Sequence, residues 1–352
     1  MVSAYQNRKI LVTGGLGFIG SNLAVRLVHA GARVVVVDSS VHGCGADRRN
    51  LDGVAADLRV IDADIGDAAA FAAELRASSV IFNLAGELSH IHSMRHPARD
   101  AELNAMSQLR FLEECARSAP GVRVVYASTR QIYGVPRYLP VDQTYPIQPV
   151  DFNGIHKYAA TAYHLLLSSQ KRLDAAVLCL SNIYGPRMAL HIPGQGFLGN
   201  FLRHALLGRT IEVFGDGRQL RDPVYVDDTV DAFLLAGAAR ELKSRTWNVG
   251  GPEALPVAQI AAIVSAAAAA PEPVLRPFPE ERKRIDTGSY STDITRIREE
   301  LGWRPRVTFA EGIASSLEYF RREPPDRLKP RAFQPLPKLR RRPLRHPRSL
   351  AV

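Results

Sequence analysis

The stretch TGGLGFIGS, residues 13–21, follows an apolar run at residues 9–12 and opens a helical pattern that ends at Gly31. Its glycines fall where a predicted strand passes through a turn into a predicted helix. There the first glycine permits a tight turn, the second lets the backbone approach a pyrophosphate, and the third lets helix and strand pack closely. A diphosphate would then meet the positive N-terminus of the helix. The stretch predicts a dinucleotide site formed by Gly14, Gly17, Phe18, Ile19 and Gly20.

Apolar runs alternate with helical patterns through the first half of the chain. Buried parallel strands joined by crossover helices are typical of this alternation. We therefore predict an α/β fold, a Rossmann-type doubly wound parallel sheet, over residues 1–180. The runs lie at residues 9–12, 33–37, 80–84, 122–127 and 176–180, with helical patterns such as 21–30 and 99–117 between them.

Beyond residue 180 the pattern loosens and becomes mixed. It predicts a smaller α/β substrate domain over residues 181–320, of which the segments near 223–250 return to the first domain. The elements expected there are strands at 210–214 and 246–250 and helices at 225–239, 256–270 and 309–320.

The net charge of +10 is concentrated at the C-terminus. Residues 321–352 carry eleven Lys or Arg and two acidic residues, and seven prolines follow from Pro324 onward. Such a composition offers too little apolar surface to offset the entropy of ordering, so we expect a disordered basic tail over residues 321–352. Since Phe333 is its one aromatic residue and no folded reading surface is evident, nucleic-acid binding is not expected.

The cysteine pattern and the hydropathy restrict the compartment. Cys44, Cys115 and Cys179 are too scattered for a disulfide framework or a Cys-x-x-Cys metal site. No apolar segment of signal-peptide type stands at the N-terminus, and the longest apolar stretch, residues 260–270, is too short to span a bilayer. We expect a cytoplasmic protein without a membrane partner.

Asp38 ends the second predicted strand, 18 residues after Gly20. A carboxylate at this point can accept both ribose hydroxyls of NAD and would repel a 2′-phosphate. Arg48 and Arg49 follow closely and could instead favour NADP. We predict NAD, because a charged pair in a loop is more often only solvated.

The whole series of motifs strongly resembles the extended short-chain dehydrogenase/reductase family, which contains nucleotide-sugar epimerases and dehydratases. The resemblance extends from about residue 10 to residue 319, with the motifs in the family's order. They are the glycine stretch, Asp62-x-Asp64, NLAG (83–86), Asn104, ASTRQIYG (127–134), Lys157, NIYGPR (182–187), QLRDPVYVDD (219–228) and LGWRP (301–305).

The resemblance implies where the ligands lie. NAD would lie across the first domain, beside Asp64, Ile65, Leu84, Ala85 and Lys157. A nucleotide diphosphate-sugar would occupy the cleft to the second domain, and the helices at residues 101–117 and 153–170 would pair in a homodimer. On the substrate side the resemblance implies contacts from Ser89, His90, Thr129, Asn182, Arg221 and either Arg282 or Arg284.

Two catalytic positions also follow from the resemblance. Thr129 takes the place of the Ser or Thr that hydrogen-bonds the reacting hydroxyl. Lys157 takes the place of the lysine that holds the nicotinamide ribose and lowers the pKa of the base. The base itself should be the tyrosine of Tyr-x-x-x-Lys, but this chain has Asn153 there, and an amide cannot act as a base near neutral pH.

Another group must then accept the proton. His156 shares a helix face with Asn153 and Lys157, and its intrinsic pKa suits proton exchange. We therefore list Thr129, Asn153, His156 and Lys157 as catalytic candidates. His90 and His92 are the next choices as base. They could also hold a metal, but no third ligand is evident, and we expect none.

The residues after Thr129 narrow the reaction. Family 4,6-dehydratases have an Asp-Glu pair there, whereas this chain has Arg130 and Gln131, so dehydration is not expected. We predict an NAD-dependent nucleotide-sugar epimerase acting through a transient 4-keto sugar. The alternatives are another NAD-dependent oxidoreductase of a nucleotide-linked sugar or cyclitol, and a catalytically impaired NAD-binding protein. Against the last, Thr129, Lys157 and Arg221 would be superfluous in a mere dinucleotide binder.

Overall fold

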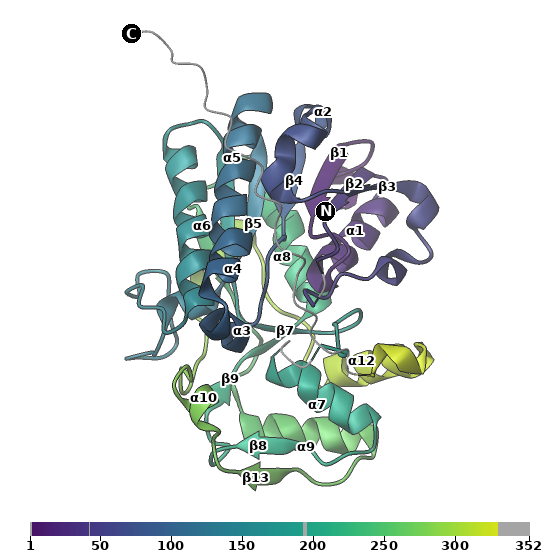
Figure 1. Ribbon diagram of the computed structural model, residues 1–352, viewed down its shortest axis with the longest axis vertical. Helices are drawn as coiled ribbons and strands as arrows, with labels where there is room; N and C mark the ends of the chain where they lie inside the picture. The colour runs from purple at the N-terminus through teal and green to yellow at the C-terminus, as the bar shows by residue number, and fades with distance from the viewer. Residues whose placement is uncertain (1, 42, 193–195, 330–352) are drawn as a thin grey trace.

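The computed structural model describes residues 2–41, 43–192 and 196–329 (Figure 1). Its centre is a seven-stranded parallel sheet with the order β11-β6-β5-β4-β1-β2-β3. The predicted fold class, a doubly wound Rossmann-type sheet, is confirmed. The strands are β1 (Lys9–Thr13), β2 (Arg33–Asp38), β3 (Leu58–Asp62), β4 (Val80–Asn83), β5 (Arg123–Thr129), β6 (Asp174–Leu180) and β11 (Thr246–Val249).

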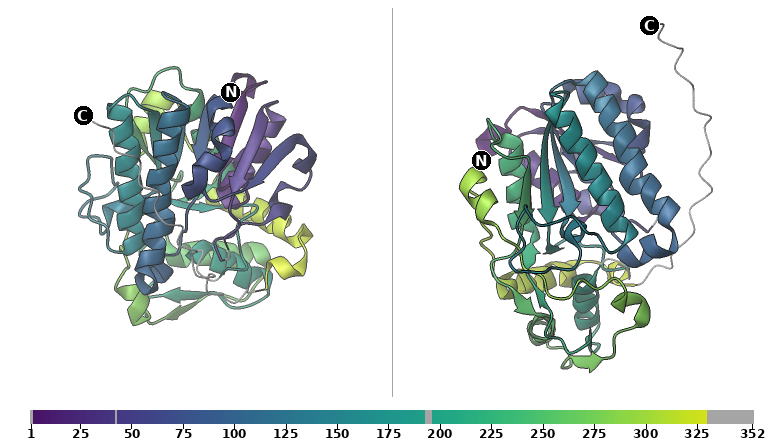
Figure 2. Two further views of the ribbon diagram at one scale, coloured as in Figure 1. Left: turned by 45° about the horizontal axis from the view of Figure 1, so that its top comes forward. Right: turned by 90° about the vertical axis from the view of Figure 1, so that its left-hand side faces the viewer.

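Helices cover both faces of the sheet, because successive side chains of each buried strand point to opposite faces. In β1, for example, Val12 packs in the layer of α1 and α8, while Leu11 packs in the layer of α2 and α5. Figure 2 shows α5 and α6 lying side by side over one face. The helices are α1 (Phe18–His29), α8 (Val226–Ala238) and α11 (Thr295–Leu301) on one side, and α2 (Ala72–Ala77), α5 (Ser107–Ser118) and α6 (Phe152–Ser169) on the other.

The helix predicted at residues 99–117 consists of three joined segments. These are α4 (Pro97–Ala101), the π-helical turn η5 (Glu102–Met106) and α5, preceded by the short helix α3 (His90–Arg95). π-Helical turns are rare and often mark functional sites. Here the turn carries the buried Asn104, whose Oδ1 accepts a hydrogen bond from the Glu87 backbone N–H (3.0 Å).

A smaller domain lies beyond the carboxyl ends of the strands, at the bottom of Figure 1. Its core is separate from those of the sheet and gathers Leu202, Ile260 and Phe309 from three helices. The chain leaves this domain to form α8 and β11 of the first. Its elements are β7 (Asn182–Tyr184), α7 (Phe197–Leu206), β8 (Glu212–Phe214), β9 (Leu220–Arg221), β10 (Pro223–Tyr225), β12 (Leu255–Pro256), α9 (Val257–Ala268), β13 (Val274–Arg276), α10 (Glu280–Lys283) and α12 (Phe309–Arg322).

The predicted start of the disordered tail at residue 321 is wrong. Helix α12 continues to Arg322, and the 3₁₀ turn Pro325–Arg327 docks on the first domain. The Arg327 side chain is buried in this turn. Its Nη1 donates to Asn50 Oδ1 (2.7 Å) and its Nε pairs with Glu323 (2.7 Å), so its charge and one of its donors are matched. Residues 330–352, the rest of the predicted tail, lie outside the described residues.

Asn50 connects this turn to the glycine loop. Its Nδ2 donates to the carbonyl of Leu16 (2.9 Å), inside the stretch TGGLGFIGS. Asn50 stands on one of five further 3₁₀ segments of the described ranges: η1 (Val2–Ala4), η2 (Arg48–Leu51), η3 (Ala55–Asp57), η4 (Ile65–Phe71) and η6 (Arg130–Tyr133). Within the described ranges no helix is long and apolar enough to cross a membrane.

Candidate active site

One cavity of about 650 Å³ lies between the two domains. It opens where strand order reverses around β1 and β4, the place at which doubly wound sheets bind ligands. Of the predicted site residues, Ser89 and His156 do not line it. Those that do are Gly14, Gly17, Phe18, Ile19, Gly20, Asp38, Asp64, Ile65, Leu84, Ala85, His90, Thr129, Asn153, Lys157, Asn182, Arg221 and Arg282.

The glycine loop fits a dinucleotide. Gly14 has φ +65°, and a Cβ there would lie 2.7 Å from the Leu84 carbonyl oxygen. A Cβ at Gly20 would collide with the Gly14 carbonyl oxygen. Side chains at either position would therefore displace the strand-to-helix turn, and their absence leaves the N-terminus of α1 open to a diphosphate.

Asp38 is tied to this loop while lining the cavity. Its Oδ2 accepts the N–H of Leu16 (3.0 Å) and its Oδ1 that of Ser40 (2.8 Å). Burial raises the pKa of Asp38, and these two N–H groups work in the opposite direction. The carboxylate is thus fixed at the end of β2, where an adenosine ribose would lie.

Both arginines that could favour NADP already pair with carboxylates. Arg48 Nη2 lies 2.5 Å from Asp62 Oδ2. Arg49 pairs with Asp47 (2.7 Å) and Asp326 (3.0 Å). Neither guanidinium is therefore an unmatched charge beside Asp38.

Lys157 brings a buried amino group to the cavity from α6. Burial lowers its pKa to about 8, against the opposing effect of Asp100. Its Nζ lies 5.7 Å from the centre of the Tyr126 ring. This lysine can exchange a proton near neutral pH more readily than a solvated one.

Thr129 ends β5 at the cavity. Its Oγ1 accepts the N–H of Gln131 (3.2 Å), which orients the hydroxyl group. The next residue, Arg130, is buried against the Tyr290 ring (4.5 Å) and donates to Thr287 Oγ1 (3.2 Å). The position where dehydratases place an acid therefore carries a packed cation.

The far end of the cavity suits a nucleotide diphosphate. Arg221 is held by the carbonyls of Leu220 and Gly288 and by Asp286 (Nη2–Oδ1 3.3 Å). Burial, with Arg130 adding to it, lowers its pKa to about 10. Asn182 lines the cavity, and its Oδ1 is buried and accepts no hydrogen bond from the described residues. Arg282 packs on the Phe214 ring (5.2 Å).

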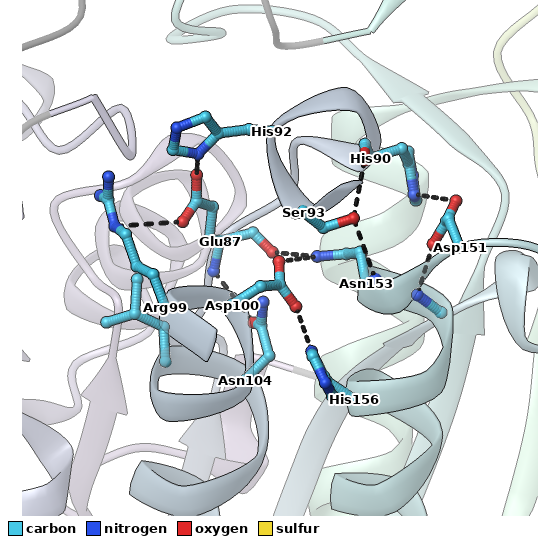
Figure 3. Close-up of polar contacts among 12 residues, drawn as sticks. Glu87, His90, His92, Ser93, Arg99, Asp100, Asn104, Asp151, Asn153 and His156 are labelled. Carbon is cyan, nitrogen blue, oxygen red and sulfur yellow. Dashed lines mark hydrogen bonds and ion pairs between the residues drawn. The ribbon is translucent and has the colours of Figure 1, made fainter. Parts of the chain in front are cut away.

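Asn153 belongs to a buried polar cluster, drawn in Figure 3. Its Nδ2 donates to the Glu87 carbonyl (3.0 Å) and to Asp100 Oδ2 (3.0 Å). The other carboxylate oxygen of Asp100 lies 2.7 Å from Nδ1 of His156. The ring of His156 thus packs behind Asp100 and does not line the cavity.

The two histidines of ELSHIHSM point to different carboxylates. His90 Nδ1 lies 2.9 Å from Asp151 Oδ2, and His92 Nδ1 lies 2.6 Å from Glu87 Oε1 (Figure 3). Only His90 of this pair lines the cavity. Ser89 accepts the N–H of His92 (3.2 Å) as the cap of α3. No group of three metal-ligating side chains occurs among the described residues.

Sequence reasoning missed the acidic partners Glu87, Asp100 and Asp151. They stand in ordinary polar contexts, far along the chain from the residues they contact. For Asp151 one signal was available, since an aspartate just before a helix is a typical N-cap. Its Oδ1 does accept the N–H of Gly154 (2.7 Å).

The glycine loop, the fixed ribose carboxylate and the buried lysine together define a dinucleotide-dependent enzyme of the Rossmann type. The chain belongs to the NAD dependent epimerase/dehydratase family, which matches residues 10–250. NAD is the cofactor of this family.

Similar proteins include several 4-epimerases. A UDP-glucose 4-epimerase of Mycolicibacterium smegmatis is 36% identical over 318 residues, 89% of this chain and 98% of that protein. The crystal structure of the Thermotoga maritima UDP-glucose 4-epimerase with UDP-glucose has a TM-score of 0.80 at 32% identity, covering 89% and 98% of the two chains. The Thermus thermophilus UDP-glucose 4-epimerase with NAD has a TM-score of 0.79 at 28% identity, covering 89% and 99%.

Proposed function

We propose that this protein epimerises a nucleotide diphosphate-sugar at C4, with uridine as the nucleotide. The single observation that carries this proposal is the shared cavity: the glycine loop, Lys157, Thr129 and Arg221 all line it. A protein that only bound a dinucleotide would need neither the threonine nor the buried arginine. The similarity to UDP-glucose 4-epimerases supports the choice of reaction.

Each side chain has a task in this reaction. Arg221 binds the diphosphate through a planar cationic group, and the Asn182 amide accepts a hydrogen bond from the nucleotide. Thr129 hydrogen-bonds the C4 hydroxyl, and Lys157 holds the nicotinamide ribose. The glycine loop, Asp38 and Lys157 would hold NAD⁺, which would supply the acceptor and donor for the hydride of C4.

The test is direct conversion. Purified protein is incubated with NAD⁺ and either UDP-glucose or UDP-galactose, and the sugars are separated by chromatography. We expect both substrates to reach the same equilibrium mixture, with Arg221→Met raising KM more than it lowers kcat. Failure of every UDP-sugar to convert or to exchange its C4 hydrogen would contradict the proposal.

A second candidate is an NAD-binding protein without turnover. Asn153 favours it, because this residue stands where the family has its tyrosine base and already donates to Asp100 and Glu87. The same incubation separates the two candidates. A protein that binds NAD and UDP-sugar by calorimetry but converts none would be of this second kind.

A homodimer through α5 and α6 is part of the proposal. Ile155, Tyr158 and Leu166 follow one another at helical spacing along α6 and are exposed, at 45%, 39% and 55%. A second copy would cover this stripe. Leu166→Glu should convert a dimer to a monomer in light scattering, whereas the same change at Leu275, which is 58% exposed on β13, should not. We also propose a reducing cytoplasmic setting, which suits the free thiols of Cys44, Cys115 and Cys179.

A further inference from the structure

We propose that His90, oriented by Asp151, is the general base that replaces the missing tyrosine. The inference rests on the proposed epimerase function and names the group that takes the proton from the reacting C4 hydroxyl. It is carried by the position of the His90 ring, which contacts a buried carboxylate on one side and lines the cavity.

Asp151 is a rigid and charged partner. Its side chain is fully buried at the start of α6, where Oδ1 caps the helix by accepting the Gly154 N–H (2.7 Å). Burial by itself would raise the pKa of Asp151, but His90, this N–H group and Arg130 outweigh it and lower the pKa. The carboxylate therefore stays ionised with its Oδ2 facing His90.

That contact determines the tautomer of His90. Nδ1 of His90 and Oδ2 of Asp151 lie 2.9 Å apart, although neither atom makes a hydrogen bond of good geometry with the described residues. A negative oxygen at this distance favours a proton on Nδ1, which leaves the lone pair on Nε2. The Nδ1 atom is buried, so the 30% exposure of the side chain belongs to its other atoms. A neutral imidazole with a buried N–H and an accessible lone pair is the form that serves as a base in carboxylate–histidine pairs.

The other histidines of the cluster do not meet these conditions. His156 and His92 also face carboxylates through Nδ1, at 2.7 and 2.6 Å, but neither lines the cavity. Asn153 lines it but offers an amide, which cannot accept a proton at neutral pH. Figure 3 shows the His90–Asp151 pair apart from the Asp100–His156 pair.

The proposed step is balanced. The hydroxyl proton moves to Nε2 of His90, the electrons of the O–H bond form the C4=O bond, and the C4 hydrogen leaves with its electron pair to bound NAD⁺. In the return step the protonated ring gives the proton back to the oxygen. Asp151 is a positioning residue, since it contacts only the ring.

Five variants test this proposal, measured with UDP-galactose and NAD⁺: His90→Ala, His90→Gln, Asp151→Asn, the competing His156→Ala and, as the control, His29→Ala. General-base catalysis contributes about 10²- to 10⁴-fold, so both His90 variants should lose kcat in that range while UDP affinity stays within about twofold. Added imidazole should restore part of the activity of His90→Ala. His29→Ala, at the exposed end of α1 and outside the cavity lining, should keep kcat within about threefold. His156→Ala should lose less activity than either His90 variant.

Asp151→Asn retains a cap on α6, because asparagine is as good an N-cap as aspartate. It should lower kcat about tenfold or more and leave thermal stability nearly unchanged. Its second readout is ¹⁵N-histidine NMR, in which the His90 signal is identified by its loss in His90→Gln. The wild-type signal should show the Nδ1–H tautomer, and Asp151→Asn should shift it toward Nε2–H.

The outcomes separate this inference from the function on which it rests. An inactive wild-type protein overturns the proposed epimerase function. An active wild type with full activity in His90→Ala, or with His90 in the Nε2–H tautomer, overturns the inference alone. If His156→Ala loses activity and His90→Ala does not, the proton acceptor is the His156–Asp100 pair.

Discussion

Nδ1 of His156 lies 2.7 Å from Oδ1 of Asp100. The second oxygen of the same carboxylate accepts the Asn153 amide, so the residue at the family's tyrosine position stabilises a buried anion. Asn153 is therefore part of the polar framework that joins α4 to α6. Its substitution should change stability as well as chemistry.

Asn153→Ala should lower the free energy of unfolding by about 1–3 kcal/mol, because Asp100 Oδ2 and the Glu87 carbonyl would each lose a buried donor. Urea titration monitored by tryptophan fluorescence measures the change. Ser169→Ala, which removes an exposed hydrogen bond to the Leu166 carbonyl, is the control and should stay within about 0.5 kcal/mol. Equal effects of the two substitutions would contradict a framework role for Asn153.

Lys157 should make stability depend on pH in the alkaline range. Its pKa is about 8 in the folded protein and about 10.4 unfolded, so between these values the unfolded chain binds more protons. Stability then rises with pH in that window, on the order of 1 kcal/mol per pH unit, and is unaffected by this lysine below about pH 7. Lys157→Met should remove that rise in denaturation curves at pH 7, 8, 9 and 10, and the exposed Lys243→Met should retain it.

Asp38 should select NAD over NADP. Asp38→Ala should weaken NAD binding by about 10- to 100-fold, the range expected for hydrogen bonds to a charged group, and narrow the NAD preference in calorimetry. Asp62→Asn is the complementary test of cofactor choice, because it would release Arg48 from its ion pair with Asp62 and leave a cation available to a 2′-phosphate. It should raise NADP affinity without weakening NAD; tighter NADP than NAD binding by the wild type would refute the assignment.

The C-terminal turn should contribute to stability. A chain ending at Glu323 should melt roughly 2–6 °C below one ending at Lys329, because Asn50 Oδ1 loses its buried donor, Arg327. Arg327→Met in the full chain should reproduce most of this difference in calorimetry. If the two truncated chains melt together, the docked turn is energetically neutral.

Much of the fold could be predicted from local pattern. The long apolar strands β1, β2 and β5 are buried, and their runs are evident in the sequence. Strand β3 (Leu58–Asp62) was missed because it lies at the sheet edge, where Arg59 and Asp62 are exposed and interrupt the apolar run. The pair β7 and β10 was missed because three residues are too few to show a period.

The candidate site divides in a similar way. Ordered motifs indicated the residues that line the cavity, and their individual roles remain predictions. The sequence could not indicate which histidine lines the cavity. Residues on one helix face spread over a wide arc, and their spacing does not show which distant side chains they contact. His156 turns toward Asp100, 56 residues away in sequence, and His90 toward Asp151. The burial of Arg327 could not be predicted from composition either, because its contact with the distant Asn50 does not change the basic, proline-rich character of the segment.

The contact between Arg327 and Asn50 has a consequence for biosynthesis. The two residues are 277 positions apart, an interval that a ribosome translates in roughly 14–55 s at about 5–20 residues per second. The glycine loop thus leaves the ribosome well before the turn that docks beside it. A nascent chain stalled before residue 327 should therefore retain NAD more weakly than a chain that includes the docked turn.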